Sequence, residues 1–128
     1  MVLVLGGAYQ GKHEFVLRRF DLVPGDILDC TADTDPQSVP SGCRCVAGFD
    51  QLVLALLDRG EDPVAWTGAH LRQLDGAVVL CRDLFCGVVP ADPRLRRWRE
   101  ETGRCCTLLA AHAGQVYRLF CGIDQRLK

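Results

Sequence analysis

Short apolar runs alternate with segments of helical periodicity along this chain, and this alternation constrains its fold most. Four runs are typical of strands buried in a sheet, and they cover residues 2–5, 26–30, 77–81 and 116–121. Apolar side chains recur at helical spacing over about residues 11–20, 49–60, 62–74 and 95–112. The order predicts an α/β fold with a short, mostly parallel sheet between helical layers, a three-layer α/β/α arrangement. Residues 31–47, rich in Pro, Ser, Gly and Asp, are expected to form a loop.

Length, charge and hydropathy limit the function classes. The 128 residues, 48% of them hydrophobic and 24% charged, suit one domain over residues 1–128. A net charge of −1 argues against a nucleic-acid partner. No apolar run reaches the roughly 20 residues of a membrane span, and residues 1–5 lack the charged leader of a signal peptide. We therefore expect a soluble, cytoplasmic protein.

Eight cysteines raise the question of disulfides or zinc. Their spacing includes one C-x-C and one adjacent pair but no C-x-x-C, so it lacks the paired ligands of a structural zinc site. Cys81 and Cys121 close apolar runs, and Cys105 lies at helical spacing with other apolar residues. We expect mostly buried, reduced thiols and no structural zinc. Cys43 and Cys45 fall in the expected loop and have no assigned role.

Polar residues follow each expected strand, where parallel sheets bind their ligands. They are Gly6 to Lys12 after the first strand, Asp29 and Thr31 after the second, Arg82 and Asp83 after the third, and Gly122 and Asp124 after the fourth. Because the ends of these parallel strands lie at one edge of the sheet, these polar residues favour a binding site at that edge.

The stretch "GGAYQGKH" follows the first strand and opens the first helix. Its residues Gly6, Gly7, Ala8, Tyr9, Gln10, Gly11 and Lys12 fit the pattern G-x-x-x-x-G-K. In such loops the backbone N–H groups, the helix N-terminus and the lysine hold the phosphates of a nucleotide, ATP or GTP. A plain glycine-rich turn is the alternative.

His13 stands where these loops usually carry a hydroxyl that binds Mg²⁺. Imidazole is a softer donor that Mg²⁺ rarely selects, so His13 is expected to be a helix-surface residue or a hydrogen-bond partner of a phosphate. Five arginines between Arg94 and Arg104 are interpreted as a solvated helix face or a site for phosphate-bearing ligands.

The stretches "VVLCRDLFCGVVP", "RRWREETGR" and "CGIDQRLK", with the loop, resemble the adenosylcobinamide kinase / adenosylcobinamide-phosphate guanylyltransferase family of cobalamin biosynthesis. That family carries a "GGARSGKS"-like loop, V-S-N-E-V-G-x-G-I-V-P, R-x-F-R-D-x-x-G and a terminal G-x-P-x-x-L-K. The positions that match are Asp83 at the family's Glu, residues 87–90 at its G-I-V-P, residues 98–100 at F-R-D, Gly103 at the next Gly, and Leu127 with Lys128 at L-K. The resemblance covers roughly half the chain in the right order.

The resemblance implies a P-loop NTPase-like fold and phosphoryl transfer from ATP or GTP to the hydroxyl of cobinamide. Lys12 would hold the phosphates, Asp29 or Asp83 would carry Mg²⁺, and Asp83 could instead orient the acceptor hydroxyl. Ordinary loop-end caps are the alternative for both aspartates. Phosphate or substrate contacts are assigned to Arg82, Arg97 and Arg99. A homo-oligomer is also implied.

Departures from the family pattern limit these implications. The family's Asn before Glu is Arg82, its N-Q pair is Cys106 with Thr107, and its loop hydroxyl is His13. The segment that would carry the guanylylated histidine has no counterpart, and His70 and His112 are interpreted as structural, His112 on the buried stripe of its helix. We therefore expect guanylyl transfer to be lost. "DILDCT" could match either of two family segments. A non-catalytic nucleotide- or corrinoid-binding protein and an unrelated small-molecule kinase stay open.

Overall fold

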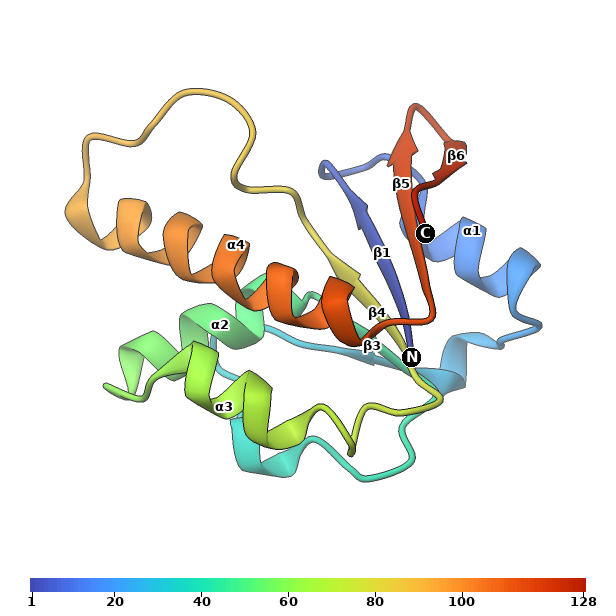
Figure 1. The fold of residues 1–128 in the computed structure, drawn as a ribbon, viewed down its shortest axis with the longest axis horizontal. Helices are drawn as coiled ribbons and strands as arrows, with labels where there is room; N and C mark the ends of the chain where they lie inside the picture. Colours follow the sequence, from blue (N-terminus) through green and yellow to red (C-terminus); the bar gives the residue numbers. More distant parts are fainter.

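Six strands form one mostly parallel sheet in the computed structural model, which describes residues 1–128 (Figure 1). The spatial order is β2-β3-β4-β1-β5-β6, and only β6 runs antiparallel to its neighbour. The strands are β1 (Val2–Gly6), β2 (Ile27–Asp29), β3 (Cys45–Ala47), β4 (Val78–Cys81), β5 (Gln115–Phe120) and β6 (Ile123–Arg126). The predicted α/β class and mostly parallel sheet are confirmed.

Helices cover both faces of the sheet, so the fold has three layers (Figure 1). One face carries α1 (Lys12–Arg19), and the other carries α2 (Phe49–Asp58), α3 (Pro63–His70) and α4 (Pro93–His112). Short 3-10 turns lie at Pro24–Asp26 and Pro36–Ser38. The Asp62 carboxylate accepts the N–H groups of Val64 and Ala65, which confirms the predicted helix start.

The two faces have separate apolar cores. Seventeen buried residues, with Phe49, Leu52 and Leu109 among them, pack between the sheet and α2, α3 and α4. Ten buried residues, including Phe15 and Tyr117, fill the face under α1. The strands β1, β3, β4 and β5 contribute to both clusters, because helices cover both of their faces.

Two strands were not predicted. β3 lies inside the segment expected to be a loop, where its residues Cys45, Val46 and Ala47 are fully buried between β2 and β4. Three residues among prolines and glycines are too few to show a strand pattern. β6 is exposed along its whole length and forms only because Cys121 and Gly122, both with positive φ, turn the chain back along β5.

The long helix α4 also differs from the expected stripe. Thr102, Cys105 and Leu109 are buried as predicted, but Leu95 lies at the exposed end. His112 is exposed and its Nε2 lies 2.7 Å from the Asp75 carboxylate, so its placement on the buried stripe was wrong.

Five cysteines are buried thiols, namely Cys30, Cys45, Cys81, Cys105 and Cys106. Cys45 is therefore a core residue of β3 and not part of a loop, while half-buried Cys43 donates its S–H to the Cys45 carbonyl at 3.1 Å. Cys86 and Cys121 are exposed. None of the helices combines the length and apolar character that crossing a membrane requires.

Candidate functional site

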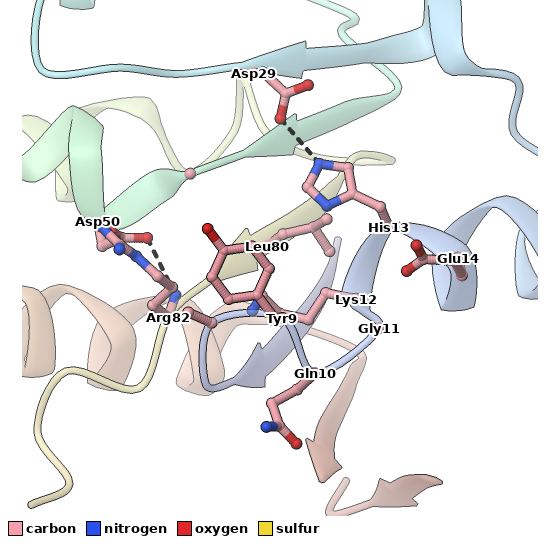
Figure 2. Close-up of a pocket in the computed structure, with 12 residues that line it drawn as sticks. Tyr9, Gln10, Gly11, Lys12, His13, Glu14, Asp29, Asp50, Leu80 and Arg82 are labelled. Atoms are coloured by element: carbon pink, nitrogen blue, oxygen red, sulfur yellow. Dashed lines mark hydrogen bonds and ion pairs between the residues drawn. The ribbon is translucent and has the colours of Figure 1, made fainter. Parts of the chain in front are cut away.

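A cavity of about 520 Å³ lies beyond the carboxyl ends of β1, β2 and β4 (Figure 2). The loop after β1 forms one wall, the end of β2 and the start of α2 form another, and β4 closes the base. Its lining comprises Ala8, Tyr9, Gln10, Gly11, Lys12, His13, Glu14, Asp29, Gly48, Asp50, Leu80 and Arg82. The predicted gathering of polar residues at this edge of the sheet is therefore present in part.

The loop Gly6–Lys12 is held close to the sheet. A Cβ on Gly6 would lie 2.8 Å from the Leu119 carbonyl oxygen, so the first glycine permits the close approach to β5. Gly11 has a φ of 84° and directly precedes α1. None of the backbone N–H groups of residues 7–11 donates to another backbone group. The loop thus presents a run of donors free for a ligand.

Lys12 folds back over this loop. Its Nζ donates to the carbonyl oxygens of Gly6 at 2.9 Å and Gly7 at 2.6 Å. Burial lowers the pKa of the Lys12 amine below its usual value, and the charges of Asp50 and Asp83 oppose that shift. The amine therefore lies half-buried beside the free N–H groups.

The hairpin that joins β5 and β6 supports the loop from the other side. The Gln10 carbonyl accepts the N–H of Gly122 at 3.2 Å, and its side-chain oxygen accepts the N–H of Cys121. The predicted polar residue Asp124 lies in β6 and not at the cavity.

His13 and Asp29 meet at the mouth of the cavity (Figure 2). His13 Nε2 lies 2.9 Å from Asp29 Oδ1, and the two side chains are 48% and 67% exposed. Adjacent ligands of an octahedral ion with bonds of about 2.1 Å lie about 3 Å apart, so one ion could contact both atoms. The structure places His13 beside the Asp29 carboxylate, a contact that the sequence did not predict.

Asp50, at the start of α2, is the functional candidate that the sequence reading missed. Its carboxylate is fully buried and accepts from the Arg82 guanidinium and the Arg82 backbone N–H. Trp98 of α4 donates its indole N–H to the Asp50 carbonyl at 2.6 Å. An acidic residue in the first turn of α2 was the available signal, but its meaning depends on the unpredicted strand β3.

The other predicted site residues do not line the cavity, although Asp83 lies beside the glycine-rich loop, where a Cβ on Gly7 would be 3.8 Å from its Oδ1. Asp83 does not line the cavity, and its carboxylate lies 3.5 Å from Arg118. Arg99 donates to the carbonyls of Phe85 and Gly87, and Arg97 lies on the α4 surface. Thr31 bonds within its own turn. Of the predicted cationic contacts, the structure therefore brings Lys12 and Arg82 to the cavity, but not Arg97 or Arg99.

Several arginines of α4 have carboxylate or carbonyl partners. Arg94 pairs with Asp58 at 2.6 Å, and Arg104 pairs with Glu100 and Glu101. These contacts match the interpretation of a solvated helix face. His70 stacks on Trp66 with ring centroids 3.9 Å apart and contacts the Trp66 carbonyl through Nδ1, a structural arrangement.

The chain contains no group of three or more His, Cys, Asp or Glu side chains placed to hold a metal ion. A divalent cation at the cavity could take Asp29 as a carboxylate ligand, with a bound phosphate and water supplying the other oxygen ligands. Mg²⁺ is commonly held in this way, by one or two carboxylates and the substrate.

Neither a scan against models of protein families nor a search of curated proteins finds a match to this chain. The resemblance described above therefore depends on its four short segments alone.

Proposed function

We propose that this chain binds a nucleoside triphosphate in the cavity through the loop Gly6–Lys12, in the manner of a P-loop. The observation that carries the proposal is the run of unpaired backbone N–H groups over residues 7–11, with Lys12 beside it. Amide donors, a cation and a helix N-terminus converge there, and this combination suits phosphate oxygens.

The proposed reaction is transfer of the γ-phosphoryl group to a hydroxyl acceptor. Phosphoryl transfer depends on positioning and charge neutralisation, which Lys12 and the loop amides supply. A bound Mg²⁺ would neutralise charge between the phosphates, with Asp29 as its carboxylate ligand. The choice of cobinamide as the acceptor and ATP or GTP as the donor follows from the family resemblance.

Binding without turnover is the second candidate, and the setting of Arg82 favours it. Its guanidinium is held by the buried Asp50 carboxylate at 2.6 Å, which restrains it from following a migrating phosphoryl group. Only one of the two predicted metal-binding carboxylates, Asp29, lines the cavity. The cavity therefore has the amide donors and the lysine that phosphate binding needs, but it lacks part of the set of carboxylates and mobile cations that catalysis needs.

Calorimetry with ATP and GTP tests the binding proposal. Lys12→Ala should weaken triphosphate binding at least about tenfold, because the half-buried cation faces the phosphates. Lys128→Ala is the matched control, since Lys128 contacts the carbonyls of Ala110 and Ala111 outside the cavity. The proposal would be contradicted if Lys12→Ala bound the triphosphate as tightly as the parent, or if the parent did not bind it at millimolar concentration.

Mass spectrometry after incubation with ATP or GTP and cobinamide then separates the two candidates. Phosphorylated cobinamide that is absent with Lys12→Ala supports the kinase. Tight binding without a phosphorylated product supports the non-catalytic protein.

A further inference from the structure

The outer edge of β6 is open. All four of its residues are exposed, and β6 ends the strand order of the sheet. Ile123 and Leu127, at the two ends of this edge, are 72% and 55% exposed. An open edge flanked by apolar side chains is a template for pairing with another strand, and proteins usually protect such edges.

The pairing of β6 with β5 determines which backbone groups face outward. Residues of an antiparallel strand alternate between bonding one neighbour and facing away from it. Leu127 donates its N–H to the Val116 carbonyl at 2.7 Å, so residues 123, 125 and 127 bond toward β5. Asp124 and Arg126 therefore direct their N–H and C=O groups to the open edge.

We propose that two copies of this chain pair along β6 about a two-fold axis at Gln125, so that their sheets become continuous. In this register Asp124 of each copy lies opposite Arg126 of the second copy, and each such pair can exchange two backbone hydrogen bonds. The axis generates the charge pair twice. Ile123 of each copy lies opposite Leu127 of the second copy, on the other face of the strand.

The charges of Asp124 and Arg126 favour this register over the other symmetric registers. An outward-facing residue must pair with another outward-facing residue, which leaves two symmetric alternatives. One places Asp124 opposite Asp124 of the second copy, and the other places Arg126 opposite Arg126 of the second copy. Like charges directly opposite destabilise a strand pair, so the axis at Gln125 is the favoured arrangement.

The side chain of Arg126 is available for this contact. Its Nε donates to the Lys128 carbonyl at 2.8 Å, which leaves the terminal nitrogens for a carboxylate across the axis. The ladder ends where Leu127 and Lys128 both donate to the Val116 carbonyl, as in a β-bulge. Because the paired segment is short, we expect a dimer that dissociates at micromolar concentrations. The proposal does not depend on nucleotide binding.

Sedimentation equilibrium over a concentration series up to the millimolar range tests the pairing. The parent should dimerise, and Asp124→Arg and Arg126→Asp should each dimerise at least about tenfold more weakly, because both attractive pairs become repulsive. An equimolar mixture of the two variants should recover the dimer, since every facing pair is then again of opposite charge. Asp33→Arg, an exposed charge reversal distant in sequence from β6, is the control.

A cross-link gives a second readout that does not depend on charge. In a background with Cys86→Ser and Cys121→Ser, Gln125→Cys should form a covalent dimer with oxidised glutathione, since Gln125 faces its own copy across the axis. Asp33→Cys should not. A monomeric parent at every concentration would overturn the proposal, as would single charge reversals that dimerise like the parent or a mixture that stays monomeric.

Discussion

The fully buried carboxylate of Asp50 lies 2.6 Å from the guanidinium of Arg82, which connects the start of α2 to the end of β4. Arg82 also packs over the Trp98 ring, with its Cζ 5.6 Å from the ring centroid. Three segments distant in sequence therefore meet at the base of the cavity. Removal of either charge affects both the fold and the cavity wall.

We expect Arg82→Met to destabilise the fold by about 3 kcal/mol, because it leaves the Asp50 carboxylate buried without its counter-charge. Asp50→Asn should destabilise it less, since Arg82 keeps partial access to water and the amide retains a hydrogen-bond acceptor. Urea unfolding measures both. Arg94→Met, which breaks an exposed pair of the same 2.6 Å distance, should leave the unfolding free energy nearly unchanged. Equal losses for Arg82→Met and Arg94→Met would contradict the prediction.

Gly48 has a steric role that Gly60 lacks. Both have positive φ, 68° and 72°, but a Cβ on Gly48 would lie 2.6 Å from the Cys30 carbonyl oxygen, whereas nothing lies within 4 Å of one on Gly60. Gly60→Ala should lower the unfolding free energy by about 1 kcal/mol from backbone strain alone. Gly48→Ala should cost at least about 3 kcal/mol, since β2 and α2 must separate. Thermal unfolding that ranks the two variants equally would show that the contact at Gly48 is relieved at little cost.

The contact between His13 and Asp29 predicts a metal preference. If a triphosphate binds as proposed, the imidazole nitrogen should make Mn²⁺ or Co²⁺ support binding better than Mg²⁺. His13→Ser should reverse the order, because a hydroxyl is a harder ligand. Calorimetry with a non-hydrolysable triphosphate and each metal gives the affinity ratio. His112→Ser is the control, as His112 contacts a carboxylate at 2.7 Å outside the cavity. An unchanged ratio in His13→Ser would mean that His13 is not a ligand.

Buried thiols predict a loss of stability at alkaline pH. Burial raises the pKa of Cys45 to about 12 and that of Cys30 to about 11, above the ordinary value of 9.0. The unfolded chain releases these protons from about pH 9 upward, while the folded chain retains them. The contribution of the two thiols to the free energy of unfolding is therefore complete below pH 9 and is lost as the pH rises toward 12.

Urea unfolding at about pH 8 and about pH 10 measures this loss. The decrease in the free energy of unfolding between the two pH values should be smaller in Cys45→Ala than in the parent. Cys86→Ala, which alters an exposed cysteine, should show the same fall as the parent. A fall of the same size in all three proteins would assign the pH dependence to other groups.

The sequence predicted those elements whose own residues carry a pattern. β1 and β4 are continuous apolar runs, and Asp62 with Pro63 marked the start of α3. β3 was missed because its three residues become strand only through pairing with β2 and β4. For the same reason Asp50 was missed, since its place beside Arg82 depends on a strand that local patterning does not show.

The candidate site also has a part that the sequence predicted and a part that it did not. The loop and Lys12 were predicted from one continuous stretch, and the structure places them at the cavity. The partners of charged side chains could not be predicted, because Asp83 meets Arg118 and Arg82 meets Asp50 through tertiary packing. Spacing along the chain does not determine which opposite charge is nearest in space.

The unequal cover of the two sheet faces has a dynamic consequence. Only α1, a helix of eight residues that buries Phe15 and Val16, covers the face with the smaller core, whereas three helices cover the other. Local opening should therefore begin at α1, and its amide hydrogens should exchange with solvent faster than those in the middle of α4. Because α1 starts at Lys12, the last residue of the glycine-rich loop, we expect the entrance of the cavity to widen and narrow as α1 opens, without unfolding of the rest of the molecule.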